Sequence, residues 1–200
     1  QNRLIEDLLD VARLISGKLQ LEHEEVDLPS VVEHSAESLK PLAAKKNVEI
    51  IFVEDRPDDD CKIIGDRNRL AQVFSNVIEN AIKFSDDGGS IEVSIVSCDP
   101  NAIIKIRDYG AGISPEFLPQ VFERFRQDTS GDHKKGGLGL GLAIVRNLVE
   151  VQGGSVAVTS EGEGKGAEFT ITLPLVCLQP GGPSDDLPNR IEQSVADNVR

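Results

Sequence analysis

Three polar residues, Asn76, Asn80 and Lys83, follow one another at spacings of four and three in a segment with helical periodicity. At that spacing the side chains emerge from one face of a helix on consecutive turns. An Asn amide oxygen is a neutral ligand for Mg²⁺, and a lysine one turn further on can meet phosphate charge. Any surface helix can also carry such a polar face, and in isolation that simpler interpretation is favoured.

A glycine-rich run, GGLGLGLAI from Gly136 to Ile144, leads into an apolar-periodic segment that predicts a helix ending near Val151. Glycines let backbone N–H groups converge on a ligand, and the helix dipole adds positive potential, which together suit phosphate. A flexible loop before an ordinary helix fits the run equally well.

An alternating strand pattern ends at Asp108 and continues into DYGAGIS, Asp108 to Ser114. A carboxylate there can accept a hydrogen bond from an exocyclic amine, while Gly110 and Gly112 let a flat ring approach the backbone. Asp and Gly are also frequent in ordinary turns, so this segment alone does not identify a ligand.

The periodicity of the chain predicts the elements that must position these residues. Asp66 can cap a helix from Arg67 to about Phe84, and Asp27 with Pro29 can begin another that runs to about Lys46. A short helix is expected from Ser114-Pro115, and a glycine-rich turn, GEGKG, joins the last two strands. Strands are expected at 19–23, 48–53, 62–64, 91–95, 102–108, 155–160 and 168–173. This mixture predicts an open α+β sandwich with helices on one face.

The two ends of the chain differ from its middle. Residues 1–18 carry a broad apolar stripe that is typical of a helix covered by another helix. Beyond Leu175 the composition shifts to Pro, Gly, Ser and Asp, as in a linker. We therefore expect a helix at 1–18 covered by an upstream segment or a second copy of the chain, with a helix folded back on its own domain as the alternative. A main domain is expected at 19–175 and a linker or tail at 176–200, in a piece of a longer protein that continues upstream of Gln1.

Composition excludes some classes of partner. The 200 residues carry a net charge of -13, which disfavours binding to nucleic acid. The sequence holds no signal peptide and no apolar stretch long enough to span a bilayer, so we expect no direct membrane contact. Cys61, Cys98 and Cys177 form no CxxC pair, which fits idle or buried thiols and a cytoplasmic location.

The order of the motifs carries more specificity than any one of them. NVIENAIKFS, DYGAGIS, FERF (Phe122 to Phe125) and GGLGLGLAI resemble, in order and spacing, the N, G1, F and G2 boxes of sensor histidine kinases. Upstream, LIEDLLDVARLISGKLQLEHEEVDL resembles the second helix of the family's dimerisation domain and the entry into its catalytic domain. This likeness implies that 1–18 is a partial dimerisation helix. The resemblance implies a Bergerat-type ATP-binding fold, a two-layer sandwich with a mixed, mostly antiparallel sheet covered by helices on one face and preceded by one helix.

Carried over residue by residue, the resemblance implies an ATP site with Mg²⁺. Asn80 would coordinate the metal, with Asn76 nearby and Lys83 on the phosphates, and Asp108 would bind the adenine amine. Residues 122–135 would form a mobile lid, in which Arg126, Lys134 and Lys135 are equal candidates for a phosphate contact. The residues expected to bind ATP are Asn76, Asn80, Lys83, Asp108, Gly110, Gly112, Ile113, Phe125, Gly137, Leu138, Gly139, Leu140 and Gly141.

Two departures shape the expected activity. Gyrase, heat-shock and mismatch-repair ATPases carry a Glu general base where this chain has Asn76, and a neutral Asn cannot take a proton from water, so we expect slow hydrolysis. The family often has Ser or Thr where this chain has Ala167, which puts a hydroxyl contact there in doubt.

The acceptor of the phosphate is expected outside the chain. His23, His34 and His133 all lack the acidic residue and Arg-Thr-Pro-like context of the family's phosphorylated histidine, so that histidine is expected upstream of Gln1. The resemblance implies as partners the dimerisation and histidine-phosphotransfer helices of the parent kinase, the receiver domain of a response regulator and, for the parent, a second copy of itself.

Two other classes of function stay open. A gyrase-type ATPase would show measurable hydrolysis, and a non-catalytic module would use the nucleotide only to dock a partner. Serine kinases that control sigma factors share the nucleotide boxes, but the dimerisation-like helix argues against them.

Overall fold

A computed structural model describes residues 20–53, 61–98, 100–127 and 138–176 of the chain. The helix expected over residues 1–18 and the tail from residue 177 onward lie outside the described residues, as do His133, Lys134, Lys135 and Gly137. The domain boundaries drawn from the sequence therefore stay a prediction.

The centre of the structure is a five-stranded sheet with the order β2-β4-β5-β7-β6. Its strands are β2 (Glu49–Phe52), β4 (Ser90–Cys98), β5 (Asn101–Asp108), β7 (Ala167–Pro174) and β6 (Ser155–Thr159). β2 pairs with β4 in parallel, and the other three pairings are antiparallel. The sheet is thus mixed and mostly antiparallel, as the resemblance implied.

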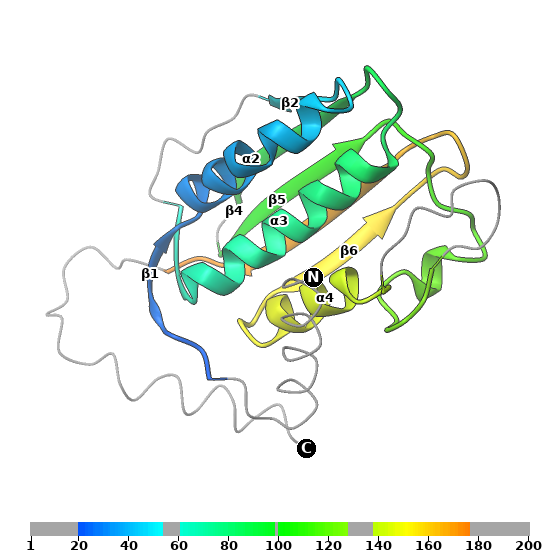
Figure 1. Ribbon diagram of the computed structural model, residues 1–200. Helices are drawn as coiled ribbons and strands as arrows, with labels where there is room; N and C mark the ends of the chain where they lie inside the picture. The colour runs from blue at the N-terminus through cyan, green and yellow to red at the C-terminus, as the bar shows by residue number, and fades with distance from the viewer. Residues whose placement is uncertain (1–19, 54–60, 99, 128–137, 177–200) are drawn as a thin grey trace, which may run out of the picture.

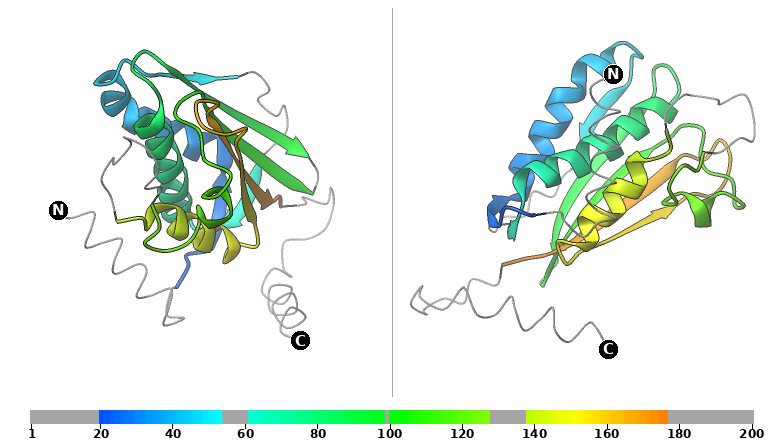
Figure 2. Two further views of the ribbon diagram at one scale, coloured as in Figure 1. Left: turned by 90° about the vertical axis from the view of Figure 1, so that its right-hand side faces the viewer. Right: turned by 60° about the horizontal axis from the view of Figure 1, so that its bottom comes forward.

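Helices cover one face of this sheet, as Figures 1 and 2 show. They are α2 (Leu28–Ala44), α3 (Arg67–Phe84) and α4 (Gly141–Glu150). A small antiparallel pair, β1 (Glu24–Asp27) with β3 (Lys62–Gly65), lies beside them. The α+β sandwich with helices on one face is confirmed.

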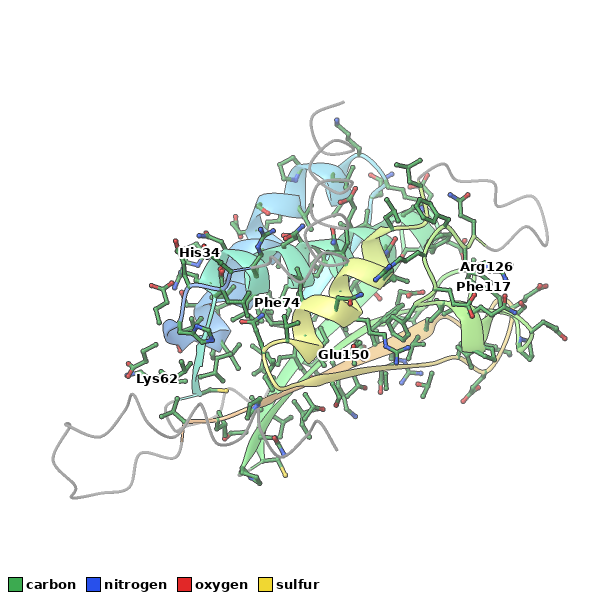
Figure 3. All side chains as sticks on the ribbon, turned by 90° about the horizontal axis from the view of Figure 1, so that it is seen from below. His34, Lys62, Phe74, Phe117, Arg126 and Glu150 are labelled. Atoms are coloured by element: carbon green, nitrogen blue, oxygen red, sulfur yellow. The ribbon has the colours of Figure 1, made fainter. Side chains whose placement is uncertain are left out.

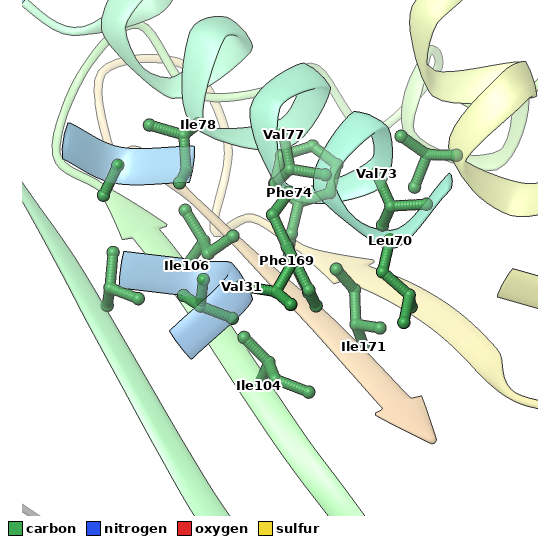
Figure 4. Close-up of a cluster of buried hydrophobic side chains, with 14 of the residues drawn as sticks. Val31, Leu70, Val73, Phe74, Val77, Ile78, Ile104, Ile106, Phe169 and Ile171 are labelled. Carbon is green, nitrogen blue, oxygen red and sulfur yellow. The ribbon is translucent and has the colours of Figure 1, made fainter. Parts of the chain in front are cut away.

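The core lies between the helices and the sheet. On β5 and β7 every second residue is buried, because successive side chains of a strand point to opposite faces. Figure 4 shows side chains of α3, among them Leu70 and Phe74, directed toward those of the sheet. Burial of each large apolar side chain contributes roughly 1.5–3 kcal/mol. The fully buried members include Phe74, Leu28, Ile63, Leu70, Ile78, Ile91, Ile104, Ile106, Ile144 and Leu148.

The start of α3 confirms the cap expected from the sequence. The Asp66 carboxylate accepts a hydrogen bond from the Arg69 N–H at 3.0 Å, which satisfies one of the free donors of the first turn. Asp27 occupies the N-cap position of α2, but its side chain makes no capping hydrogen bond.

Two expected elements are displaced. Residues 20–23 of the strand expected at 19–23 have no regular structure, and β1 starts at Glu24 because β3 offers it partners only from Lys62 to Gly65. The helix expected from Ser114-Pro115 is also wrong: the chain makes turns there and then a single 3-10 turn at Leu118–Gln120. Pro119 has no N–H to donate, which works against a longer helix at this point.

Candidate functional site

The polar face of α3 lies against the N-terminal end of α4. Asn76 is only 7% exposed, and its side-chain amide lies 3.5 Å from the carbonyl oxygen of Gly141, the first residue of α4. Asn80 and Lys83 are half-buried on the following turns, and the Lys83 ammonium lies 4.9 Å from the centre of the Phe84 ring. The structure thus joins the Asn/Lys helix to the glycine-rich run, 65 residues apart in the chain.

The residues before α4 form a tight turn rather than a loose loop. Gly139 has a φ of +68°, and a Cβ atom there would lie 2.5 Å from the carbonyl oxygen of Arg126. The Phe125 N–H donates to the Gly139 carbonyl at 2.9 Å. Leu140 is buried, whereas Leu138 is exposed. Because the first N–H groups of a helix lack internal partners, the end of α4 presents donors and positive potential beside Asn76.

Asp108 precedes a turn that packs against the last turn of α3. It is buried at the end of β5, and its carboxylate accepts a hydrogen bond from the Gly110 N–H at 3.0 Å. Burial raises the pKa of the Asp108 carboxyl, and hydrogen bonds from the backbone of Gly110 and Ala167 partly offset this. The carboxylate oxygens can accept further hydrogen bonds, and burial keeps water away from them. Such a group is suited to bind an amine donor of a ligand.

Gly110 and Gly112 are required by close packing. A Cβ atom on Gly110 would collide with the backbone of Phe84 at the end of α3, where the Ala111 N–H donates to the Phe84 carbonyl at 3.0 Å. Gly112 has a φ of +68° and packs against the backbone of Gly162. The turn after β5 is therefore fixed to the last turn of α3.

The turn between β6 and β7 contacts the turn after Asp108, which the sequence did not indicate. The Gly164 N–H donates to the Ala111 carbonyl at 2.7 Å, and the Ser160 hydroxyl accepts from the Ile113 N–H at 3.0 Å. Ala167, where the family often has a hydroxyl, pairs with Asp108 in the register of β5 and β7. No local pattern could have revealed these contacts, because the partners are about 50 residues apart.

The FERF segment has two distinct phenylalanines. Phe122 is half-buried and contacts Phe169 edge-on, with ring centres 6.4 Å apart. Phe125 is 64% exposed and has a positive φ of 61°, which is uncommon for a residue other than glycine. Arg126 pairs with Glu123 at 3.0 Å on the surface. Which of the three basic candidates contacts a phosphate stays a prediction, and Lys134 and Lys135 lie outside the described residues.

The site has three sides: the polar face of α3, the N-terminal end of α4, and the turn from Asp108 to Ile113. Among the described residues no group of three or more His, Cys, Asp or Glu side chains could hold a metal. Any divalent cation here would depend on amide oxygens and on the oxygens of an anionic ligand. A helix N-terminal end beside a buried carboxylate and a glycine-bearing turn is an arrangement suited to a nucleotide-binding domain.

Comparisons with known proteins identify the family. The family model described as histidine kinase-, DNA gyrase B-, and HSP90-like ATPase matches residues 65–176, and the chain belongs to this family. The hybrid signal transduction histidine kinase D of Dictyostelium discoideum is 34% identical over 88% of this chain and 13% of that protein.

Solved structures agree with this assignment. Full-length ShkA in complex with AMPPNP has a TM-score of 0.75 and 33% identity, over 86% of this chain and 35% of that one. The mycobacterial sensor histidine kinase MprB has a TM-score of 0.67 and 32% identity, over 77% of this chain and 98% of that one. The domain is the catalytic, ATP-binding type of sensor histidine kinases. In the described part of the chain, no helix has the length and apolar character needed to cross a membrane.

Proposed function

We propose that this chain holds ATP with Mg²⁺ and delivers the γ-phosphate to a histidine outside these 200 residues, as the kinase domain of a two-component sensor. The observation that carries the proposal is Asn76, buried beside the first residue of α4. Its amide cannot act as a general base for water at neutral pH, so the site is suited to holding ATP rather than hydrolysing it.

The donor set fits the phosphate end of this ligand. The amide oxygen of Asn80 is a hard, neutral ligand of the kind that Mg²⁺ accepts, and Asn76 lies one turn earlier on the same helix. When bound, the metal supplies charge neutralisation between phosphate oxygens. Lys83 and the N-terminal end of α4 add positive potential on the same side, which favours an anion there.

The other end of the site fits a purine. Asp108 can accept a hydrogen bond from the exocyclic amine of adenine, and Gly110 and Gly112 allow the close backbone packing that fixes the turn after this carboxylate. Guanine carries a carbonyl oxygen at the corresponding ring position. This oxygen and the Asp108 carboxylate are both hydrogen-bond acceptors, so they would repel each other. The site therefore favours ATP over GTP.

One histidine of the described residues, His34, is held within its own helix. The Nδ1 atom of His34 donates to the Ser30 carbonyl at 2.6 Å within α2. Figure 3 shows His34 toward one end of the molecule and Arg126 and Phe117 toward the other. We therefore place the acceptor on a dimerisation or phosphotransfer helix of the parent protein, with a receiver domain as the next acceptor and a homodimer as the functional unit.

Transfer of labelled phosphate from ATP tests the proposal. The 200-residue chain is expected to bind ATP without becoming labelled, and a version extended upstream through the acceptor helix is expected to gain an acid-labile label. Rapid release of phosphate by the chain alone would instead indicate a gyrase-type ATPase. Binding without any label on the extended version would indicate a non-catalytic module.

A further inference from the structure

Lys46, just beyond α2, reaches the C-terminal end of α3. Its ammonium donates to the carbonyl oxygens of Ile82 at 3.0 Å and Lys83 at 2.8 Å, and also to that of Ser85. Its own carbonyl accepts from the Gly88 N–H at 3.2 Å. One side chain therefore joins the end of α2 to the last turn of α3, 36 to 39 residues further along the chain.

This contact is suited to a cation. The last carbonyls of a helix have no partners within the helix, and the helix dipole places partial negative charge there. An ammonium group has three donors and full positive charge, so it can meet three carbonyls that converge on one point. In this place Lys46 fixes the direction in which α3 ends.

The turn that Lys46 holds connects two sides of the candidate site. Lys83 lies within it, and Asn80 lies on the turn before. The carbonyl of Phe84, between those that Lys46 contacts, accepts from the Ala111 N–H at 3.0 Å, and Gly110 packs against the same backbone. A shift of this turn would move the phosphate side and the adenine side together.

We propose that Lys46 is a positioning residue for nucleotide binding, which sets the last turn of α3 relative to the turn after Asp108 without touching the ligand itself. This inference rests on the proposed ATP site. It also assigns a role to the end of α2, an element that otherwise only covers the sheet.

The test compares two substitutions of Lys46 with two controls. Lys46→Met keeps the length of the side chain and removes its donors, and Lys46→Arg restores positive charge and donors. Lys45→Met changes the exposed neighbouring lysine. Val26→Ala creates a cavity at a buried position in β1 and controls for a general loss of stability. The affinity for AMPPNP with Mg²⁺ is measured by calorimetry, well below the unfolding temperature of each variant.

Lys46→Met is expected to weaken nucleotide binding roughly tenfold, the size of one hydrogen bond to a charged group, and Lys46→Arg to recover part of the loss. Lys45→Met and Val26→Ala should bind as the unchanged protein does. If Lys46→Met binds AMPPNP with unchanged affinity, or if Val26→Ala loses as much affinity as Lys46→Met, the positioning role of Lys46 is wrong. Neither result would contradict the proposed ATP site. Absence of binding by the unchanged protein would overturn both.

Discussion

Asp108 is the residue at which the site departs most from ordinary protein chemistry. A carboxylate is rarely buried without a cation beside it, because burial disfavours the charged form. Here the two neighbouring backbone N–H groups offset only part of that cost, and the pKa stays raised. Such a group gives a specific hydrogen bond to a ligand at some expense of the free energy of folding.

Asp108→Asn should therefore separate binding from stability. The Asn oxygen can still accept from the Gly110 N–H, but its NH₂ group would face the adenine amine with a donor. We expect ATP affinity to fall about tenfold or more, which corresponds to one hydrogen bond to a charged group, while the unfolding temperature stays equal or rises. Calorimetric titration and thermal unfolding of the same sample measure both quantities. Loss of both together would show that Asp108 is mainly structural.

The pH dependence of stability gives a second measurement on Asp108. Because its pKa is raised above the ordinary value of 3.8, the folded state binds more protons than the unfolded state between those two values. The contribution of Asp108 to the free energy of unfolding therefore decreases as the pH rises through this window. The stability of the unchanged protein relative to Asp108→Asn should fall over the same window. A flat difference between the two curves would contradict the raised pKa.

At the scale of elements, the N-terminal end of α4 depends on two glycines with different tasks. Gly139 is required by its backbone conformation and by the nearby backbone of Arg126. Gly141 has no such restriction, since a Cβ atom there would lie 4.0 Å from the side chain of Asn76. From the sequence both glycines looked alike, as the floor and hinge of a lid.

Alanine at each position should distinguish these tasks. Gly139→Ala should lower the free energy of unfolding by about 1–2 kcal/mol or more, because an L-residue is strained in the left-handed region, and should weaken ATP binding as well. Gly141→Ala should leave stability unchanged or slightly higher, since alanine favours a helix, and should weaken only the binding. Chemical denaturation and ligand titration of both variants check this. If Gly141→Ala binds ATP with unchanged affinity, the backbone of Gly141 does not contact the phosphates.

Most elements could be predicted from the sequence because their signals are local. The cap at Asp66, the alternation before Asp108 and the apolar period of α3 each depend on residues a few positions apart. Lys46 and Ser160 could not be found in this way, because each acts on backbone groups about 36 to 50 residues away. The prediction of a strand at 19–23 was wrong for a related reason. The position of this strand depends on its pairing with β3, which lies far away in the sequence.

At the scale of the whole molecule, the negative net charge of the chain disfavours binding of an anion such as ATP. A chain with a charge of -13 repels ATP, so binding must depend on local positive potential and on the metal. Lys83 and the N-terminal end of α4 provide the first, and Asn80, with Asn76 nearby, is the ligand that we propose for the second. Affinity for ATP should therefore fall sharply when Mg²⁺ is removed.

The most direct test of the ATP site is a titration of the isotope-labelled protein with AMPPNP and Mg²⁺, followed by the amide signals of individual residues. We expect shifts concentrated at residues 76–83, 108–113 and 138–141, with the signals of β1 and β3 unchanged, and we expect these shifts to be lost when Mg²⁺ is withdrawn. Saturable shifts located elsewhere, or the absence of shifts at these three segments, would contradict it.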